Sequence, residues 1–115
     1  MSLVKNTLRK NKQQRVADSR DEIARIKKEL KSRCQTLCKS GRLREALLYG
    51  SALDPDFFHR DSDIDIALGG VEPSDSWAVA GYLGRELGRR IDVQFVEDMT
   101  DRWVGKIREQ GFSLL

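Results

Sequence analysis

Two short apolar segments with polar residues at their adjoining ends constrain the fold of this chain most. The first is Leu47–Ser51 (Leu-Leu-Tyr-Gly-Ser), and the second is Asp61–Leu68 (Asp-Ser-Asp-Ile-Asp-Ile-Ala-Leu). Successive strand residues point to opposite faces of a sheet, so Asp63 and Asp65 share one face while the isoleucines between and after them take the other. Carboxylates inside an apolar strand are costly unless a cation neutralises them. The pattern therefore predicts a strand whose apolar face is buried and whose other face presents the acidic side chains.

The length of the chain limits what can surround these acidic side chains. At 115 residues, the chain fits one domain with a modest core, and it is too short for a cofactor domain plus a substrate domain. Any substrate pocket must therefore be open or completed by a partner. No apolar run approaches the roughly 20 residues of a membrane span, and the start lacks the apolar core of a signal peptide. We expect a cytoplasmic protein without a membrane contact.

The periodicity of apolar residues predicts alternating helices and strands. In chain order, the expected elements are a helix over 20–40, a strand over 45–49, a strand over 63–68, a helix over 74–88, a strand over 90–96, a helix from 100 to 111, and an edge strand over 112–115. This order predicts an α/β or α+β domain on a small mixed sheet flanked by helices. Ser19 and Glu22 have capping-box spacing at the start of the first helix, and Gly41 would end it. Trp77 and Leu83 are expected on one side of the second helix.

The charge is distributed unevenly along the chain. Residues 1–40 hold 12 Lys/Arg and 4 Asp/Glu, a net charge of +8, whereas residues 41–115 hold 9 basic and 14 acidic residues, a net charge of −5. We divide the chain into a basic arm, residues 1–17, and a single domain, residues 18–115. The arm is either a solvated, loosely helical lead-in or a contact surface for nucleic acid or an acidic protein. The absence of interleaved aromatic residues favours the first interpretation.

Cys34 and Cys38 lie one helical turn apart in the first expected helix. No histidine and no second cysteine pair lies nearby, which argues against a zinc site. We expect two ordinary helix residues and no disulfide.

Three carboxylates can meet if the strands over 63–68 and 90–96 are neighbours. Asp63, Asp65 and Asp92 would then bring about three negative charges into a small volume, where like charges disfavour one another. A divalent cation resolves this conflict, and oxygen ligands with open positions suit Mg²⁺ or Mn²⁺. Two such ions about 4 Å apart would clamp the attacking and leaving oxygens of a displacement at phosphorus.

Gly50 and Ser51 form a turn suited to phosphate. Glycine allows a phosphate to approach the main chain, and backbone N–H groups with a hydroxyl can hold it. Together with the carboxylates, the turn indicates attack at an α-phosphate with pyrophosphate as the leaving group.

Each of these features also has an ordinary structural explanation. An Asp-x-Asp pattern at a strand start is often turn and cap chemistry. Asp92 could simply pair with Arg89 or Arg90, and His59 is expected to be a loop residue. The order of the features along the chain makes the combination more specific than any one of them.

The combination resembles the minimal nucleotidyltransferase (MNT) group of the DNA polymerase beta superfamily over about residues 42–115. The matching residues are Gly50-Ser51, Ser62-Asp63-Ile64-Asp65-Ile66-Ala67-Leu68, Ile91-Asp92-Val93, and the ending Lys106-Ile107-Arg108-Glu109-Gln110-Gly111-Phe112-Ser113-Leu114-Leu115. The resemblance implies a polymerase-beta-type fold. It also implies that Asp63, Asp65 and Asp92 are catalytic metal ligands for two Mg²⁺ ions, and that Gly50 and Ser51 bind the phosphates of ATP.

The segment after Ser51 departs from the commonest MNT pattern. Many members follow Gly-Ser with an Arg-rich helix start and a further glycine, whereas this chain has Ala52-Leu53-Asp54-Pro55-Asp56. The departure removes a basic residue from beside the expected phosphates.

Three functions are compatible with the sequence. The first is transfer of a nucleoside monophosphate, AMP from ATP, to a tyrosine of a HEPN toxin, since small MNT proteins resemble the antitoxins of HEPN/MNT toxin–antitoxin pairs. The second is an MNT-like binding module that neutralises a partner by contact. The third is nucleic-acid binding through the basic arm.

Overall fold

The computed structural model describes residues 3–59 and 61–115, which form a mixed α+β domain. Its helices are α1 (Leu3–Lys39), α2 (Ser76–Leu87) and α3 (Asp101–Gln110). Its strands are β1 (Glu45–Tyr49), β2 (Ile64–Gly69), β3 (Ile91–Phe95) and β4 (Phe112–Ser113). Short 3-10 turns span Gly50–Leu53, Pro73–Asp75 and Val96–Asp98. The class and the order of helices and strands are those expected from the sequence.

The four strands form one mixed sheet in the order β3-β2-β1-β4. β1 pairs antiparallel with β2 and with β4, whereas β2 pairs parallel with β3. A parallel pair needs a crossover connection, and α2 supplies it. The condition on which the acidic site depended, that the second and third strands are neighbours, is confirmed.

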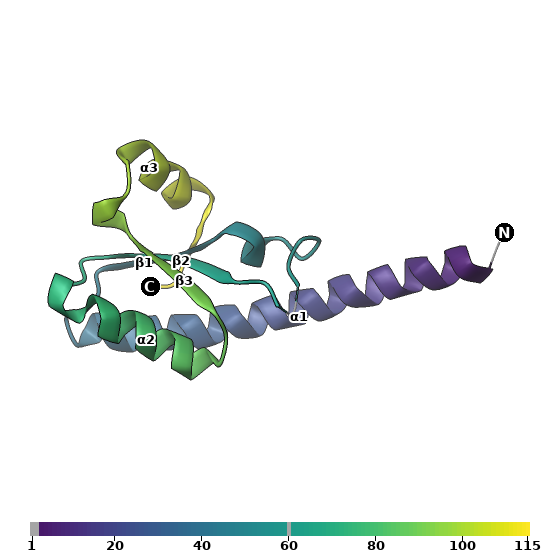
Figure 1. Ribbon diagram of the computed structural model, residues 1–115, viewed down its shortest axis with the longest axis horizontal. Coiled ribbons are helices and arrows are strands. Elements are labelled where there is room, and N and C mark those ends of the chain that lie inside the picture. The colour runs from purple at the N-terminus through teal and green to yellow at the C-terminus, as the bar shows by residue number, and fades with distance from the viewer. Residues whose placement is uncertain (1–2, 60) are drawn as a thin grey trace.

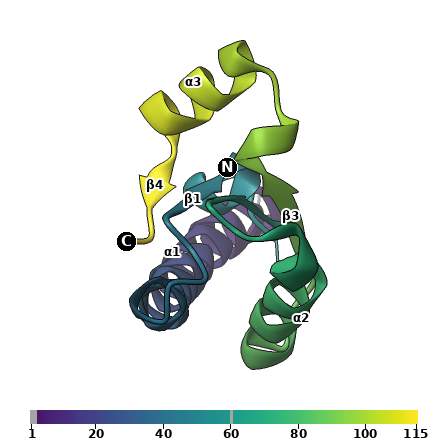
Figure 2. The same ribbon diagram turned by 90° about the vertical axis from the view of Figure 1, so that its left-hand side faces the viewer.

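Helices cover the two faces of the sheet unequally. Figure 1 and Figure 2 show α1 and α2 on one face and α3 on the other. The core on the first face contains Leu48, Ile64 and Ile66, each fully buried. A smaller cluster on the α3 face consists of Leu47, Ala67 and Ile107. Asp92 and Gln94 of β3 are exposed, so α3 leaves this side of the sheet open.

The first helix begins much earlier than expected. α1 starts at Leu3, and the prediction that a Ser19–Glu22 capping box starts the helix near residue 20 is wrong. The buried Ser19 hydroxyl donates instead to the carbonyl oxygen of Phe58 at 3.1 Å. Glu22 pairs with Arg25 and Arg89. The Ser19–Phe58 and Glu22–Arg89 contacts therefore hold the segments before β2 and β3 against the helix, and Ser19 and Glu22 do not cap it.

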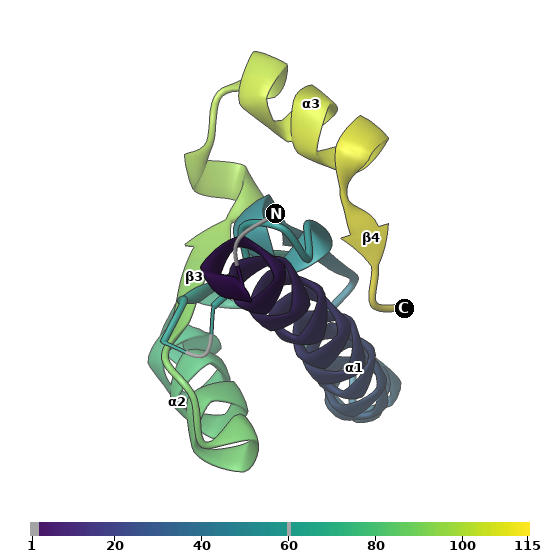
Figure 3. The same ribbon diagram turned by 90° about the vertical axis from the view of Figure 1, so that its right-hand side faces the viewer.

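The N-terminal part of α1 extends beyond the sheet (Figure 1), and in Figure 3 this end of the helix faces the viewer. Residues 11–18 are exposed except for the half-buried Val16, and Ser19 is the first buried residue among the described side chains. The expected division between residues 17 and 18 thus lies within one continuous helix. Residues 1 and 2 of the expected arm lie outside the described part. We call residues 3–18 the overhang of α1.

The other helices bury narrow faces. Val79 and Leu83, four residues apart, form the buried side of α2. Trp77 is 90% exposed, so the prediction that it shares a side with Leu83 is wrong. The error arose because Trp77 lies on the opposite side of the helical period from Val79 and Leu83. Among the described residues, no helix has the length and apolarity needed to cross a membrane.

Both cysteines are free, as expected. Cys34 is fully buried in the core between α1 and the sheet, whereas Cys38 is exposed. Burial raises the pKa of the Cys34 thiol to about 12, because the thiolate would lose its hydration. The side chain therefore acts as a small apolar core residue.

Candidate active site

The candidate residues meet at one edge of the sheet, where β1 ends and β2 and β3 begin. Asp65 lies opposite Asp92 in the parallel pair and opposite Tyr49 in the antiparallel pair. Residues paired across strands point to the same face, so all three side chains lie on the face that carries α3. Asp63 lies directly before β2, two residues from Asp65, and its negative charge helps to raise the pKa of Asp65. The structure therefore places the three predicted carboxylates at the same end of the sheet, with Asp65 and Asp92 in register and Asp63 near enough to affect the pKa of Asp65.

The carboxylates influence one another electrostatically. The pKa of Asp65 is raised, first by desolvation and then by the negative charges of Asp92 and Asp63. The pKa of the Tyr49 hydroxyl is raised by desolvation and by Asp65 and Asp92. Both shifts have the direction expected where negative charge is concentrated and partly shielded from water. Negative charge is thus concentrated at Asp65, Asp92 and Asp63.

The Gly50 turn directly adjoins this charge. Gly50 has a φ of +77°, a left-handed conformation in which a side chain is unfavourable. A Cβ atom built on Gly50 would lie 2.6 Å from Oδ2 of Asp65. Only glycine can therefore sit here without moving the carboxylate. The main chain at the start of the Gly50–Leu53 turn, which includes Ser51, is thus held beside Asp65.

Asp63 and Asp92 differ in their neighbours. Nε of Arg90 lies 3.8 Å from Oδ1 of Asp63, with both side chains substantially exposed. Arg89 instead donates to Glu22 at 2.9 Å and lies over the ring of Phe58 at 4.9 Å. The alternative explanation of Asp92 as the partner of one of these arginines finds no support in these contacts. Arg90 belongs to the site through Asp63.

The chemistry of the donor set fits a hard divalent cation. Asp65 and Asp92 face each other in register, and Asp63 lies directly before β2, so their ligand atoms would all be carboxylate oxygens. Desolvation and the negative charges of Asp92 and Asp63 raise the pKa of Asp65, and a bound cation would oppose this effect. Among the side chains that the structure describes, no three acidic, histidine or cysteine residues already converge as a metal-binding cluster. An ion that binds Asp63 would compete with Arg90, which pairs with this carboxylate.

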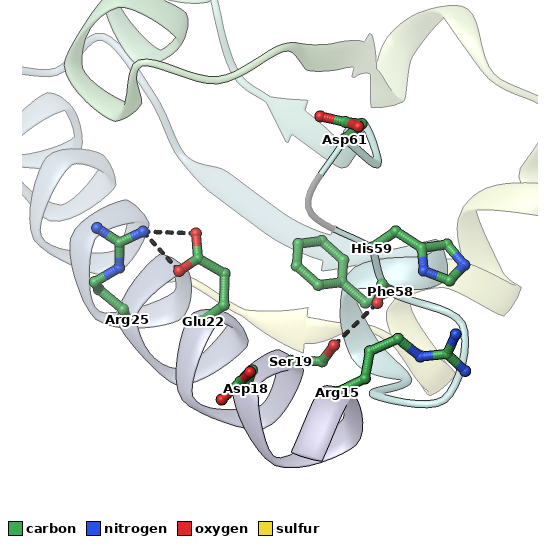
Figure 4. A pocket seen from close by; sticks show the side chains of 8 residues that line it. All are labelled: Arg15, Asp18, Ser19, Glu22, Arg25, Phe58, His59 and Asp61. Carbon is green, nitrogen blue, oxygen red and sulfur yellow. Dashed lines mark hydrogen bonds and ion pairs between the residues drawn. The ribbon is translucent and has the colours of Figure 1, made fainter. Parts of the chain in front are cut away.

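A separate hollow of about 640 Å³ lies between α1 and the loop before β2. Figure 4 shows its lining, which comprises Arg15, Asp18, Ser19, Glu22, Arg25, Phe58, His59 and Asp61. His59 is a loop residue, as expected, and its backbone N–H donates to the Ser62 hydroxyl at 2.8 Å. The described lining contains none of the candidate carboxylates and is mixed in charge. The hollow therefore belongs to the support of the loop and is distinct from the carboxylate site.

Two residues of the site were not identified from the sequence. The sequence predicts Tyr49 as part of the first strand and Arg90 as a possible partner of Asp92, and it assigns neither to the site. Strand alternation could have indicated both, because Tyr49 precedes Gly50 at the strand end and Arg90 precedes Asp92 by two residues. Their proximity to Asp65 and Asp63 depends on the register between strands, which the sequence does not contain.

No protein-family model and no curated protein sequence matches the chain. Solved structures do match. A crystal structure of a toxin-antitoxin with AMP-PNP is 23% identical with a TM-score of 0.58, over 74% of this chain and 72% of that chain. A crystal structure of the toxin-antitoxin MntA-HepT is 20% identical with a TM-score of 0.53, over 75% of this chain and 69% of that chain.

A further match is the structure of a proposed minimal nucleotidyltransferase. It is 17% identical with a TM-score of 0.57, over 84% of this chain and 93% of that chain. At these identities the likeness shows a common fold.

Proposed function

We propose that this chain, which has the fold of the minimal nucleotidyltransferases, is a Mg²⁺-dependent nucleotidyltransferase that transfers AMP from ATP to an acceptor. The observation that carries the proposal is the contact between a turn and a carboxylate pair. The Gly50 main chain lies beside Asp65, which faces Asp92 across the parallel strands. A phosphate-binding turn next to metal-binding oxygens is the arrangement that phosphoryl transfer needs.

In this proposal Asp63, Asp65 and Asp92 hold the divalent cations, two in number. The cations would supply charge stabilisation at the α-phosphate and the leaving pyrophosphate. The N–H groups of the turn at Gly50 and the hydroxyl of Ser51 would bind the outer phosphates. Catalysis would then rest on positioning and electrostatics, without a histidine as general base.

A protein is the acceptor that best fits the site. The carboxylates lie on the part of the sheet that α3 leaves open, and they are accessible from outside this small domain of 115 residues. A neighbouring molecule can therefore present a hydroxyl to them directly. Because chains of the same fold were solved as toxin-antitoxin assemblies, one of them with HepT, we propose a HEPN-type toxin as the partner. The acceptor group would be a tyrosine hydroxyl, and the modification would give this chain the role of an antitoxin.

Transfer of radiolabel from ATP to a candidate HEPN protein tests this function. ATP labelled at the α-phosphate should label the partner in the presence of Mg²⁺, whereas ATP labelled at the γ-phosphate should not. Asp65→Asn should abolish transfer, because it removes a negative ligand from the site. Asp21→Asn, which changes an exposed aspartate on α1, is the matched control and should retain full transfer.

Calorimetry with Mg²⁺ and ATP separates this enzyme from a module that acts by contact alone. Binding that is lost in Asp65→Asn supports the enzyme. Absence of both nucleotide binding and label transfer in the unchanged protein, with the partner still bound, would exclude the enzyme and favour the contact module.

A further inference from the structure

Four side chains at this end of the sheet form two facing pairs. The register places Asp65 opposite Asp92, and the backbone N–H of Ile64 donates to the carbonyl oxygen of Arg90 at 3.1 Å. Asp63 and Arg90 therefore face each other one step closer to the sheet edge, and they form an ion pair. Strand alternation directs Asp65 and Asp92 to one side, and Asp63 and Arg90 are the residues directly before the two strands. A guanidinium group is thus built into an otherwise acidic site.

The turn that would receive the phosphates brings no basic residue of its own. The segment from Gly50 to Phe58 contains no lysine or arginine, and it contains Asp54 and Asp56. A nucleoside triphosphate would add several further negative charges beside the carboxylates. Backbone N–H groups are neutral overall, so a positive side chain from another element would improve the binding of the triphosphate.

Arg90 is better placed for this task than its neighbour Arg89. Arg89 is only 14% exposed and lies against Glu22 and Phe58, on the side of the loop that contacts α1. Arg90 is 86% exposed, and its separation of 3.8 Å from the half-exposed Asp63 makes a weak pair. Little free energy is therefore needed to move the guanidinium group from Asp63 to an incoming phosphate. The planar guanidinium can also bind two phosphate oxygens at once.

We propose that Arg90 is a nucleotide-binding residue that exchanges partners when the substrate binds. In the free protein it pairs with Asp63 and offsets part of the negative charge of the site. In the complex it binds a phosphate of the nucleoside triphosphate, and Asp63 becomes available to a divalent cation. This inference rests on the proposed function and assigns the positive charge that the Gly50–Leu53 turn lacks.

The exchange predicts effects of opposite sign for one substitution. Arg90→Ala removes a positive charge beside Asp63, so the nucleotide-free protein should bind Mn²⁺ more tightly, by about two- to fivefold. The same substitution removes charge-assisted hydrogen bonds to phosphate, so Mg²⁺–ATP should bind about 10- to 100-fold more weakly. Loss of folding would weaken both, and a purely structural role would not strengthen metal binding.

Titration calorimetry of the full chain with Mn²⁺ alone, Mg²⁺–ATP and adenosine provides the measurement. Adenosine has no phosphate, so its affinity should not respond to the substitution. Arg90→Lys should bind Mn²⁺ as the unchanged protein does and should recover part of the ATP affinity. Arg85→Ala, which removes an exposed arginine of α2, is the matched control and should alter none of these affinities.

The outcomes distinguish the inference from the function on which it rests. Equal binding of Mg²⁺–ATP by Arg90→Ala and the unchanged protein would overturn the role of Arg90 and leave the proposed function intact. Weaker Mn²⁺ binding by a folded Arg90→Ala protein would overturn the exchange. If the unchanged protein binds no Mg²⁺–ATP, the proposed function and the inference fail together.

Discussion

Gly50 lies so close to the Asp65 carboxylate that one added carbon atom, the Cβ of any other residue, would displace it. Gly50 combines a φ of +77° with a carboxylate oxygen in the place that a Cβ would occupy. Gly41 has the same φ, but nothing lies within 4 Å of its Cβ position. The two glycines therefore separate the effect of backbone strain from the effect of crowding at the carboxylate.

Gly50→Ala should reduce nucleotidyl transfer by about a hundredfold, because displacement of a reacting group by about 1 Å has effects of this size. The Asp65 carboxylate must turn away from the new methyl group. Gly41→Ala should leave transfer unchanged. Each substitution should lower the free energy of unfolding by about 1–2 kcal/mol through the left-handed backbone, measured by urea denaturation. Equal transfer by the two variants would contradict the proposed position of the turn.

Arg108 connects α3 to the sheet at the element scale. Its guanidinium group donates to both carboxylate oxygens of Glu45, at 2.9 and 2.8 Å. This ion pair joins α3 to Glu45, the first residue of β1. Gly50 follows the other end of the same strand. The Arg108 side chain lowers the pKa of Glu45, through its hydrogen bonds and its charge.

The lowered pKa gives the contact a defined pH dependence. A carboxyl whose pKa is lower in the folded state stabilises the fold above its ordinary pKa, and this contribution is lost as the pH falls through the folded value. Glu45→Gln should therefore destabilise the protein by about 0.5 kcal/mol at neutral pH, and the difference should disappear once the pH is low enough to protonate Glu45 in the folded protein.

Urea denaturation at several pH values measures this effect. Glu109→Gln, at an exposed position of α3 next to Arg108, is the control and should change the free energy of unfolding much less at neutral pH. A Glu45→Gln difference that is constant from neutral to acidic pH would show that the ion pair contributes nothing to stability.

The overhang of α1 determines the shape of the whole molecule. The longest dimension is 59 Å, and the radius of gyration is 16.5 Å. A compact domain of this length has a radius of gyration of about 13 Å. The excess comes from a helix that continues past the sheet edge (Figure 1) and carries part of the positive charge of the first 40 residues.

Deletion of residues 1–15 should bring the radius of gyration in solution from near 16.5 Å toward about 13 Å, as measured by small-angle X-ray scattering. Stability should change by no more than about 0.5 kcal/mol, because the described side chains removed are exposed. Leu30→Ala, at a fully buried position of the same helix, should cost about 2–5 kcal/mol. An unchanged radius of gyration after deletion would show that the overhang is not extended in solution.

The same deletion examines the third function considered from the sequence. Binding to nucleic acid through the overhang would weaken steeply with salt and disappear in the shortened protein. Binding that survives the deletion would place any such contact elsewhere on the molecule.

Local patterns in the sequence determined the class of the fold and most of its elements. The alternation around Asp65 gave the strand and its two faces, and Thr100 and Gly111 bounded the last helix, where the Thr100 hydroxyl accepts from Trp103. Such features depend on neighbours along the chain, so a sequence contains them. Two predictions were wrong: the start of α1 and the side of α2 on which Trp77 lies. In the folded chain Ser19 contacts Phe58 and does not cap the helix, and Trp77 is exposed, so packing decided both.

The sequence by itself determined that Asp65 and Asp92 lie on strands, that Asp63 lies where the second strand starts, and that Gly50 follows the first strand. The tertiary structure alone decided that Asp65 faces Asp92, that Gly50 adjoins Asp65, and that Arg90 rather than Arg89 enters the site. These relations depend on strand order and register, which arise from burying Ile64, Ile66 and Leu68 against α1 and α2. A sequence specifies which residues can form a site, and the packing of the core specifies which of them meet.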